Sequence, residues 1–332
     1  MEITIVTHDK RFHADDVASV SLLTSLYSNM DYEVKLIRTR DPELWKKADI
    51  LVDVGGVYDP DEGKFDHHQT SCNDTFSPSC KIPMSSVGMV WKHYGQLILE
   101  KFNENLEAED IENLHSEIYY KTILELDGHD NGILPIEGGT KNYNINMTIG
   151  SIISSLNSES RDDEDDQMNR FREAVRLFGE LFEIKFNDII SKYLDYKRNL
   201  EIIRKHITSE EYIHIPIKTN TIYRCLNEVD QEEKIKFLIL SSENDKDFTV
   251  RTRNKSNSFS PMIPLINEVS AKKLLDDDLV FIHKNLFIGK TKTLESAILL
   301  VKASLKSHQN FKYGTVVCAC VGIGGILWWL KH

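Results

Sequence analysis

The chain has 332 residues, 41% of them hydrophobic and 28% charged, so it can bury the core of one large domain or of two ordinary ones. Its formal net charge of −12 argues against a sequence-independent binder of long duplexes, because such proteins usually carry a basic face. This charge does not exclude a small pocket for a phosphate or a short oligonucleotide, since a bound divalent metal would invert the local charge.

The five cysteines are an odd number without CxxC spacing, which excludes a zinc ribbon and a disulfide framework. This cysteine pattern therefore predicts a protein that resides in a reducing compartment. Its N-terminal stretch MEITIV runs directly into a strand-like segment and offers no signal peptide. We expect a protein that faces the cytosol and carries no secretory signal.

Strand-like and helix-like segments alternate along the first 70 residues. The expected elements are a strand at Ile3–Thr7, a helix at Asp15–Tyr27, a strand at Glu33–Arg38, a short helix at Pro42–Lys47 and a strand at Ile50–Val54. Asp41 is placed to cap the short helix. This alternation predicts an α/β fold with a parallel sheet and helices on both faces.

The rest of the chain predicts more helices and a second, smaller α/β domain. Expected helices lie at Ser85–Leu99, Leu114–Leu126 and Glu295–Leu305, and expected strands at Phe237–Leu240, Phe248–Arg251 and Leu279–Ile282. Apolar residues at helical spacing from Phe171 to Tyr193 predict a long amphipathic helix, packed on the sheet or bridging two domains. We expect a catalytic domain at 1–160, a bridging helix at 161–205 and a substrate-binding domain at 206–308.

The last part of the chain is an apolar tail. Tyr313–Leu330 contains 18 residues without a charge, and a membrane span needs about 20. Trp328 and Trp329 before Lys331 fit an interfacial belt. We expect a C-terminal transmembrane anchor over 313–330, with a buried final helix or strand as the alternative.

Polar side chains follow the predicted strands at the places where a parallel sheet binds ligands, beyond the carboxyl ends of its strands. His8 follows the first strand, and Asp53 lies near the end of the third. His67 and His68 follow the strand-like Gly63–Phe65. Each residue alone also fits a structural role, such as a hydrogen-bonded histidine, a helix cap or a turn. Their joint position at one sheet edge favours a site.

The polar residues around this edge have the chemistry of metal ligands. The candidates are His8, His13, Asp15, Asp53, His67, His68, Asp127 and Asp130. Carboxylates and imidazoles without thiolates suit manganese, magnesium or iron better than structural zinc. Two such metals about 3.5–4 Å apart would hold a bridging hydroxide and clamp an in-line displacement at phosphorus. Asp53, at a strand end, is the natural bridge.

Five motifs of the chain resemble those of the melanocyte-proliferating-gene exonuclease family, a branch of the DHH phosphoesterase superfamily. They are THDKRFHADDVAS, DVGGVYDP, FDHHQ, SSVGMVWKHYG and DGHDNGI, and their order and spacing match across Ile3–Leu305. The resemblance implies a two-domain phosphoesterase with a manganese centre, Mg²⁺ being the alternative metal. It also implies 3′→5′ exonuclease activity on RNA or short oligonucleotides.

The resemblance also assigns residues. It implies metal ligands at His8, His13, Asp15, Asp53, His67, Asp127 and the neighbouring Asp130. Asp66, His67 and His68 form the DHH signature, in which the first histidine binds metal and the second faces the phosphate. Asp53, His67 and His68 are then the catalytic set.

The resemblance is weaker in the second domain. Where the family has SFxSRxxLP and HASGFIGG, this chain has SFSPMIPLI at 258–266 and HKNLFIGK at 283–290. The family arginine is absent, and Leu286 replaces a glycine. The candidates for substrate binding are Ser258, His283, Gly289, Arg251 and Arg253, together with His68. The two arginines could compensate for the missing one or lie on a solvated strand face.

These residues predict a metal-dependent phosphodiesterase that uses a two-metal-activated water, with His68 stabilising charge or protonating the leaving oxygen. One alternative is a small-nucleotide phosphatase or pyrophosphatase, which the acidic net charge and the missing arginine favour. The other alternative is a membrane-tethered scaffold with a weakened site.

Overall fold

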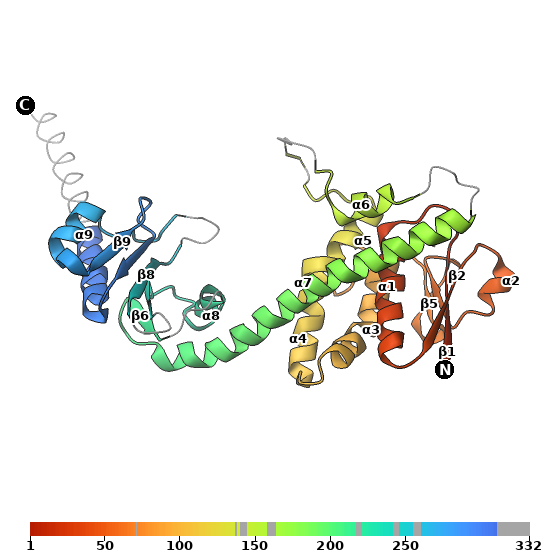
Figure 1. Cartoon of the computed structure of the whole chain (residues 1–332), viewed down its shortest axis with the longest axis horizontal. Coiled ribbons are helices and arrows are strands. Elements are labelled where there is room, and N and C mark those ends of the chain that lie inside the picture. The colour runs from red at the N-terminus through yellow and green to blue at the C-terminus, as the bar shows by residue number, and fades with distance from the viewer. Residues whose placement is uncertain are drawn as a thin grey trace, which may run out of the picture. The chain divides into compact units, whose positions relative to one another are not determined.

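The structure of the protein is a computed structural model that describes residues 1–70, 72–136, 138–139, 145–157, 164–216, 221–241, 246–254 and 260–310. The chain divides into two compact units, Met1–Ser191 and Lys192–His332 (Figure 1). In the described residues each unit holds a five-stranded sheet with helices against it. The predicted α/β class is therefore confirmed.

The sheet of the first unit is parallel except at one edge. Its strands are β1 (Glu2–Thr7), β2 (Glu33–Arg38), β3 (Ile50–Val52), β4 (Tyr58–Asp59) and β5 (Lys64–Phe65). They lie in the order β2-β1-β3-β5-β4, and only β4 runs antiparallel to its neighbour. The parallel sheet was predicted, and the short edge strand β4 was not.

The strand order of this sheet reverses between β1 and β3. From β1 the chain moves to β2 on one side, and it then continues to β3 on the other side of β1. Connections that leave in opposite directions open a crevice at the carboxyl ends of the two strands between which the order reverses. In this sheet those strands are β1 and β3.

Helices cover both faces of this sheet, as predicted. They are α1 (Ala14–Asn29), α2 (Pro42–Trp45), α3 (Ser86–Phe102), α4 (Ala108–Ile118), α5 (Leu124–Asp130) and α6 (Ile149–Ser155), with the 3-10 helix η1 (Pro60–Glu62). Helix α1 packs on α3, β1 and β3, and α3 also contacts β5. Trp45 of α2 packs against Val6 and Leu51 on the other face (Figure 1). Asp41 caps α2 through the backbone N–H of Glu43, as expected.

The helix predicted at Leu114–Leu126 is interrupted. Helix α4 passes into a π-helical segment, η2 (Tyr119–Ile123), which leads into α5. A π turn inserts extra backbone and changes which side chains share a helix face. As a result the DGHD sequence, which also fits a turn, lies in the helix α5 with Asp127 and Asp130 one turn apart.

The second unit contains a mixed sheet. Its strands are β6 (Tyr212–Ile215), β7 (Phe237–Ser241), β8 (Phe248–Thr252), β9 (Leu279–Ile282) and β10 (Ile288–Thr291). Its helices are α8 (Ile222–Val229), α9 (Glu268–Leu275), the 3-10 helix η3 (Asp276–Asp278) and a helix over 294–310. The order is β6-β7-β8-β10-β9, and only β6 and β7 are parallel. Alternate residues of β7 enter two apolar clusters, so both of its faces are buried.

The long helix expected around Phe171–Tyr193 is α7 (Glu164–His206), which has 43 residues. It begins in the first unit and ends in the second. Phe171 and Phe178 are buried near its start, while Leu200 and Ile203 join an apolar cluster of the second unit. The helix therefore contributes to the cores of both units.

In the part of the chain that the structure describes, no helix combines the length and the apolar character that a membrane crossing requires. The anchor predicted at Tyr313–Leu330 lies outside the described residues.

Gly63, which precedes β5, allows a stability test. It has φ +66°, and an added Cβ would lie 2.4 Å from the carbonyl oxygen of Asp49. Gly132 has φ +70°, but no described atom would lie within 4 Å of its Cβ. We expect Gly63→Ala to lower the free energy of unfolding by about 3 kcal/mol. Gly132→Ala should cost about 1 kcal/mol, because it adds only left-handed backbone strain. Equal losses in urea denaturation would contradict this account.

Candidate metal centre

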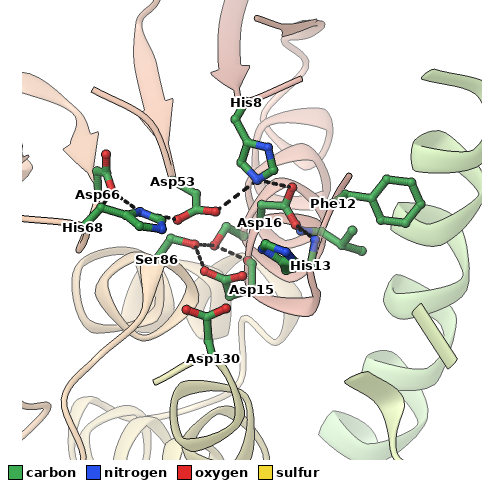
Figure 2. A network of polar contacts seen from close by, with 12 residues as sticks. His8, Phe12, His13, Asp15, Asp16, Asp53, Asp66, His68, Ser86 and Asp130 are labelled. Carbon is green, nitrogen blue, oxygen red and sulfur yellow. Dashed lines mark hydrogen bonds and ion pairs between the residues drawn. The ribbon is translucent and has the colours of Figure 1, made fainter. Parts of the chain in front are cut away.

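Three strands of the first sheet end at one edge and supply the side chains of the site. His8 follows β1, Asp53 follows β3, and Asp66, His67 and His68 follow β5. Asp53 has φ +54°, a left-handed conformation that aspartate tolerates better than most residues. Figure 2 shows its carboxylate between His8 and His68.

The first turn of α1 adds two more carboxylates. His13 is the N-cap of this helix, and Asp15 and Asp16 lie in its first turn. Asp16 Oδ1 accepts hydrogen bonds of 2.8 Å from the backbone N–H groups of His13 and Val17. Its other oxygen lies 3.2 Å from Nε2 of His8. Asp16 was not among the predicted site residues, and only its position in the DD pair could have indicated it.

Asp53 lies at the centre of this group. Its Oδ2 is 3.2 Å from His8 Nε2, and its Oδ1 is 3.4 Å from both His67 Nε2 and His68 Nδ1. The Asp53 carboxylate thus faces histidines from two different strand ends.

Potential ligand atoms gather in three sets within the described residues, and in each set they lie within 4.8 Å of one another. Asp53 belongs to two of these sets, and so does His13. The sets are His8, His13 and Asp53; Asp53, His67 and His68; and His13, Asp15 and Asp130.

Asp127 and Asp130 occupy different places although both lie on α5. Asp130 Oδ2 is 3.1 Å from His67 Nε2, so Asp130 faces the other candidate ligands. Asp127 is fully buried and belongs to none of the three sets of the described chain. The geometry therefore favours Asp130 as a ligand and does not support the predicted ligand role of Asp127.

The carboxylate of Asp127 accepts hydrogen bonds from the start of α3 and from Tyr119. Its Oδ1 accepts hydrogen bonds from the backbone N–H and the hydroxyl of Ser85, at 2.9 and 2.8 Å, and from the N–H of Gly88 at 3.1 Å. Its Oδ2 accepts one of 2.7 Å from the Tyr119 hydroxyl. Burial raises the pKa of Asp127 to about 6 against the effect of these donors. Asp127 therefore holds the start of α3, where the hydroxyl of Ser86 donates a 2.8 Å hydrogen bond to Asp15.

Several polar atoms of the site are buried without a directed hydrogen bond. Within the described part of the chain these include Asp15 Oδ1, Asp16 Oδ2, Asp53 Oδ1 and His67 Nε2. Some of them approach other ligand atoms closely but are not aligned for a hydrogen bond. Buried carboxylates are normally paired, hydrogen-bonded or bound to a metal. This set of oxygen and imidazole donors fits a divalent cation.

The histidine pKa values show how strongly the carboxylates require positive charge. Burial alone would lower the pKa of His8, but Asp53 and Asp16 outweigh it and raise this pKa to about 9. Burial is also outweighed at His67, whose pKa is raised to about 11 by Asp130 and Asp53. Burial raises the pKa of Asp16 to about 7.

The two adjacent histidines have different surroundings. The side chain of His67 is 10% exposed and faces the carboxylates, whereas that of His68 is 61% exposed. Asp66 Oδ1 lies 2.8 Å from His68 Nδ1, and Asp66 Oδ2 accepts a 2.6 Å hydrogen bond from the N–H of Gly56. Asp66 therefore orients the imidazole of His68 through its Nδ1 side. A similar contact joins His8 Nδ1 to its neighbour's backbone carbonyl at 2.8 Å.

The substrate-binding candidates of the second unit fall into distinct environments. Arg253 is 4% exposed and forms a 2.6 Å ion pair with Asp230 and a 3.0 Å hydrogen bond with Asn227. It therefore has a structural partner, and its predicted role in substrate binding is not supported. Arg251 and Gly289 line a pocket of about 270 Å³ on the sheet.

The turn between β9 and β10 contains His283, whose ring lies 4.5 Å from that of Phe287. Leu286, at the position of a family glycine, has φ +59°, so the turn keeps a backbone that favours glycine. Ser258 lies outside the described residues. The substrate-binding roles of His283, Gly289 and Arg251 stay predictions.

Comparison with known proteins assigns the family. The model of the MYG1 exonuclease family, described as the uncharacterised protein family UPF0160, matches residues 4–305. "MYG1 protein" of Dictyostelium discoideum is 31% identical over 331 residues, covering 93% of this chain and 98% of the relative. "MYG1 exonuclease" of Mus musculus is 28% identical over 325 residues, covering 91% and 84%.

Among solved structures, RecJ of Thermus thermophilus in complex with Mn²⁺ is 13% identical, with a TM-score of 0.27, and the match covers 92% of this chain and 52% of RecJ. The family match spans nearly the whole chain, and the relatives are matched over most of their length. The chain therefore belongs to the MYG1 exonuclease family, a family of metal-dependent phosphoesterases.

Proposed function

We propose that this protein is a metal-dependent 3′→5′ exonuclease that shortens RNA or short oligonucleotides, with manganese as its preferred metal. The observation that carries the proposal is the carboxylate of Asp53, which two sets of candidate ligands share at the carboxyl edge of the sheet. The exposed His68 beside it supplies a group for a phosphate. The name of the mouse relative, an exonuclease, supports a nucleic-acid substrate.

The donor set fits two divalent ions. The residues that would hold them are His8, His13, Asp15, Asp53, His67 and Asp130, with Asp16 beside His8. When bound, such ions supply positive charge for the phosphoryl oxygens and lower the pKa of a water molecule. The oxygen-rich character of the set favours manganese or magnesium over zinc.

His68 is the residue of this chain best placed to act on the phosphate. Asp66 holds its Nδ1 side and raises its pKa, so the imidazole carries a proton more readily near neutral pH. The opposite nitrogen can then donate a hydrogen bond to a phosphoryl oxygen or a proton to the leaving oxygen. His67 faces the buried carboxylates instead, which separates metal binding from proton transfer.

A small nucleotide is the second candidate substrate. Arg253 forms an ion pair with Asp230, the family arginine is absent from the sequence, and the chain carries a net charge of −12. All three observations argue against tight binding of a long phosphate backbone. The cytosol-facing location and the tail anchor at Tyr313–Leu330 stay predictions.

Asp53→Asn tests the exonuclease directly. Incubation of the wild-type protein with manganese and a 5′-labelled short RNA should give a ladder of shortened products on a gel. The substitution should reduce the rate roughly 100-fold or more, because it removes a charge shared by two of the three ligand sets. Asp61→Asn, at an exposed position in η1, is the matched control and should keep full activity. A ladder of wild-type intensity from Asp53→Asn would contradict the proposal, and cleavage of mononucleotides alone would favour the second candidate.

Substitution of the two α5 aspartates should separate metal binding from folding. We expect Asp130→Asn to weaken manganese binding roughly 10- to 100-fold with little change in stability. Asp127→Asn should instead lower the free energy of unfolding by about 2 kcal/mol or more, because an amide cannot accept all the buried hydrogen bonds. Manganese titration and urea denaturation of both variants measure these effects. The account is wrong if Asp127→Asn loses metal affinity at unchanged stability.

Manganese binding should release protons. The pKa values of about 9 for His8 and about 11 for His67 mean that both imidazoles hold protons at neutral pH, and a metal must displace them. The apparent affinity should therefore rise as the pH increases from about 7 to 9. Calorimetry in buffers of different ionisation enthalpy counts the released protons. Binding without proton release at pH 7 would disagree with these protonation states.

A further inference from the structure

We infer that Arg38 is a positioning residue of the metal centre, because it fixes the loop His8–His13 that carries two of the candidate ligands. The inference rests on the proposed function, since it assigns a role in preparing the site for metal. Nothing in the sequence pattern of the site indicates this arginine, which lies on a neighbouring strand.

The position of Arg38 follows from the sheet register. It is the last residue of β2 and pairs with Thr7, the last residue of β1. The loop His8–His13 begins directly after Thr7 and ends at the N-cap of α1. Arg38 therefore stands one strand away from the point where the loop leaves the sheet.

The guanidinium of Arg38 holds the backbone in the middle of this loop. One of its nitrogens donates a 2.6 Å hydrogen bond to the carbonyl oxygen of Lys10. Lys10 has φ +62°, a conformation that costs energy for a residue with a side chain. Such a backbone persists only where its surroundings hold it, and here a charged donor does so.

The same guanidinium connects the loop to α7. Its carbon atom lies 4.4 Å from the ring centre of Phe171 and 5.5 Å from that of Phe12. The two rings meet edge to face at 5.4 Å, and Phe12 is fully buried. A second guanidinium nitrogen donates a 3.5 Å hydrogen bond to the carbonyl oxygen of Gln167. Figure 2 shows Phe12 pointing away from the carboxylates, on the opposite side from its neighbour His13.

These contacts fix the direction of His13, the ligand at the end of the loop. Phe12 anchors the loop in the core, and its backbone N–H and carbonyl are both hydrogen-bonded at 2.9 Å by the side chain of Asn157. His13 follows Phe12 immediately and can reach the carboxylates only if this anchor holds.

Arg176, an exposed arginine on α7, provides a matched comparison. It donates hydrogen bonds of 2.7 and 2.5 Å to the carboxylates of Glu173 and Glu180, outside the loop. Its side chain is 55% exposed. It forms none of the ring contacts found for Arg38 in the described residues. Replacement of Arg176 should therefore leave the loop and its buried anchor intact.

The test measures metal binding by the full chain without nucleic acid, through the electron paramagnetic resonance signal of free Mn²⁺. Arg38→Lys keeps the positive charge but cannot bridge two carbonyls while lying flat on a ring. It should weaken manganese binding about 10- to 100-fold, the usual effect of losing a group that orients a ligand. Arg176→Lys should change the affinity by less than about 2-fold, because its ion pairs are on the surface. Equal affinities of the two variants would overturn the inference.

A second variant covers the case in which Arg38→Lys does not fold. Phe171→Leu keeps an apolar side chain but removes the ring beneath the guanidinium, and it should weaken manganese binding several-fold. Unchanged affinity in this folded variant would overturn the inference. A wild-type chain that binds no manganese would contradict the proposed function itself, so the two failures are distinguishable.

Discussion

The arrangement of the site depends on the electrostatic cost of placing Asp15, Asp16 and Asp53 together in the interior. All three are at most 4% exposed, and each has an oxygen without a directed hydrogen bond in the described chain. Buried carboxylates that lie near one another require a compensating positive charge. The raised pKa values of His8 and His67 express this requirement, and a divalent cation would satisfy it more fully.

The fold places these carboxylates and histidines at the ends of well-packed strands and in the first turn of a helix. The carboxyl ends of β1, β3 and β5 and the first turn of α1 converge at the point where the strand order reverses. A further layer holds these groups in place: Asp127 holds the start of α3, Ser86 contacts Asp15, Asp66 orients His68, and Arg38 holds the loop after β1. These polar contacts hold the carboxylates and histidines of the site in position.

The sequence predicted the features that depend on local pattern. The parallel sheet of the first unit and the polar residues beyond its strand ends follow from alternating elements, and the structure confirms their placement. Asp16 was missed because a DD pair at a helix start already has an explanation as a cap, which one of its oxygens indeed provides. The site also depends on contacts that no local pattern records. A π turn precedes α5, Asp130 rather than Asp127 faces His67, and Arg253 is paired with Asp230, which lies 23 residues away in the sequence.

The central claim is that Asp53 is shared by two metal ions. Anomalous diffraction at the manganese absorption edge, from crystals of the manganese-loaded protein, tests it most directly. The account predicts two anomalous peaks per chain that both lie next to the Asp53 carboxylate, one towards His8 and the other towards His67. A single peak remote from Asp53, or full occupancy by manganese elsewhere on the chain, would contradict it.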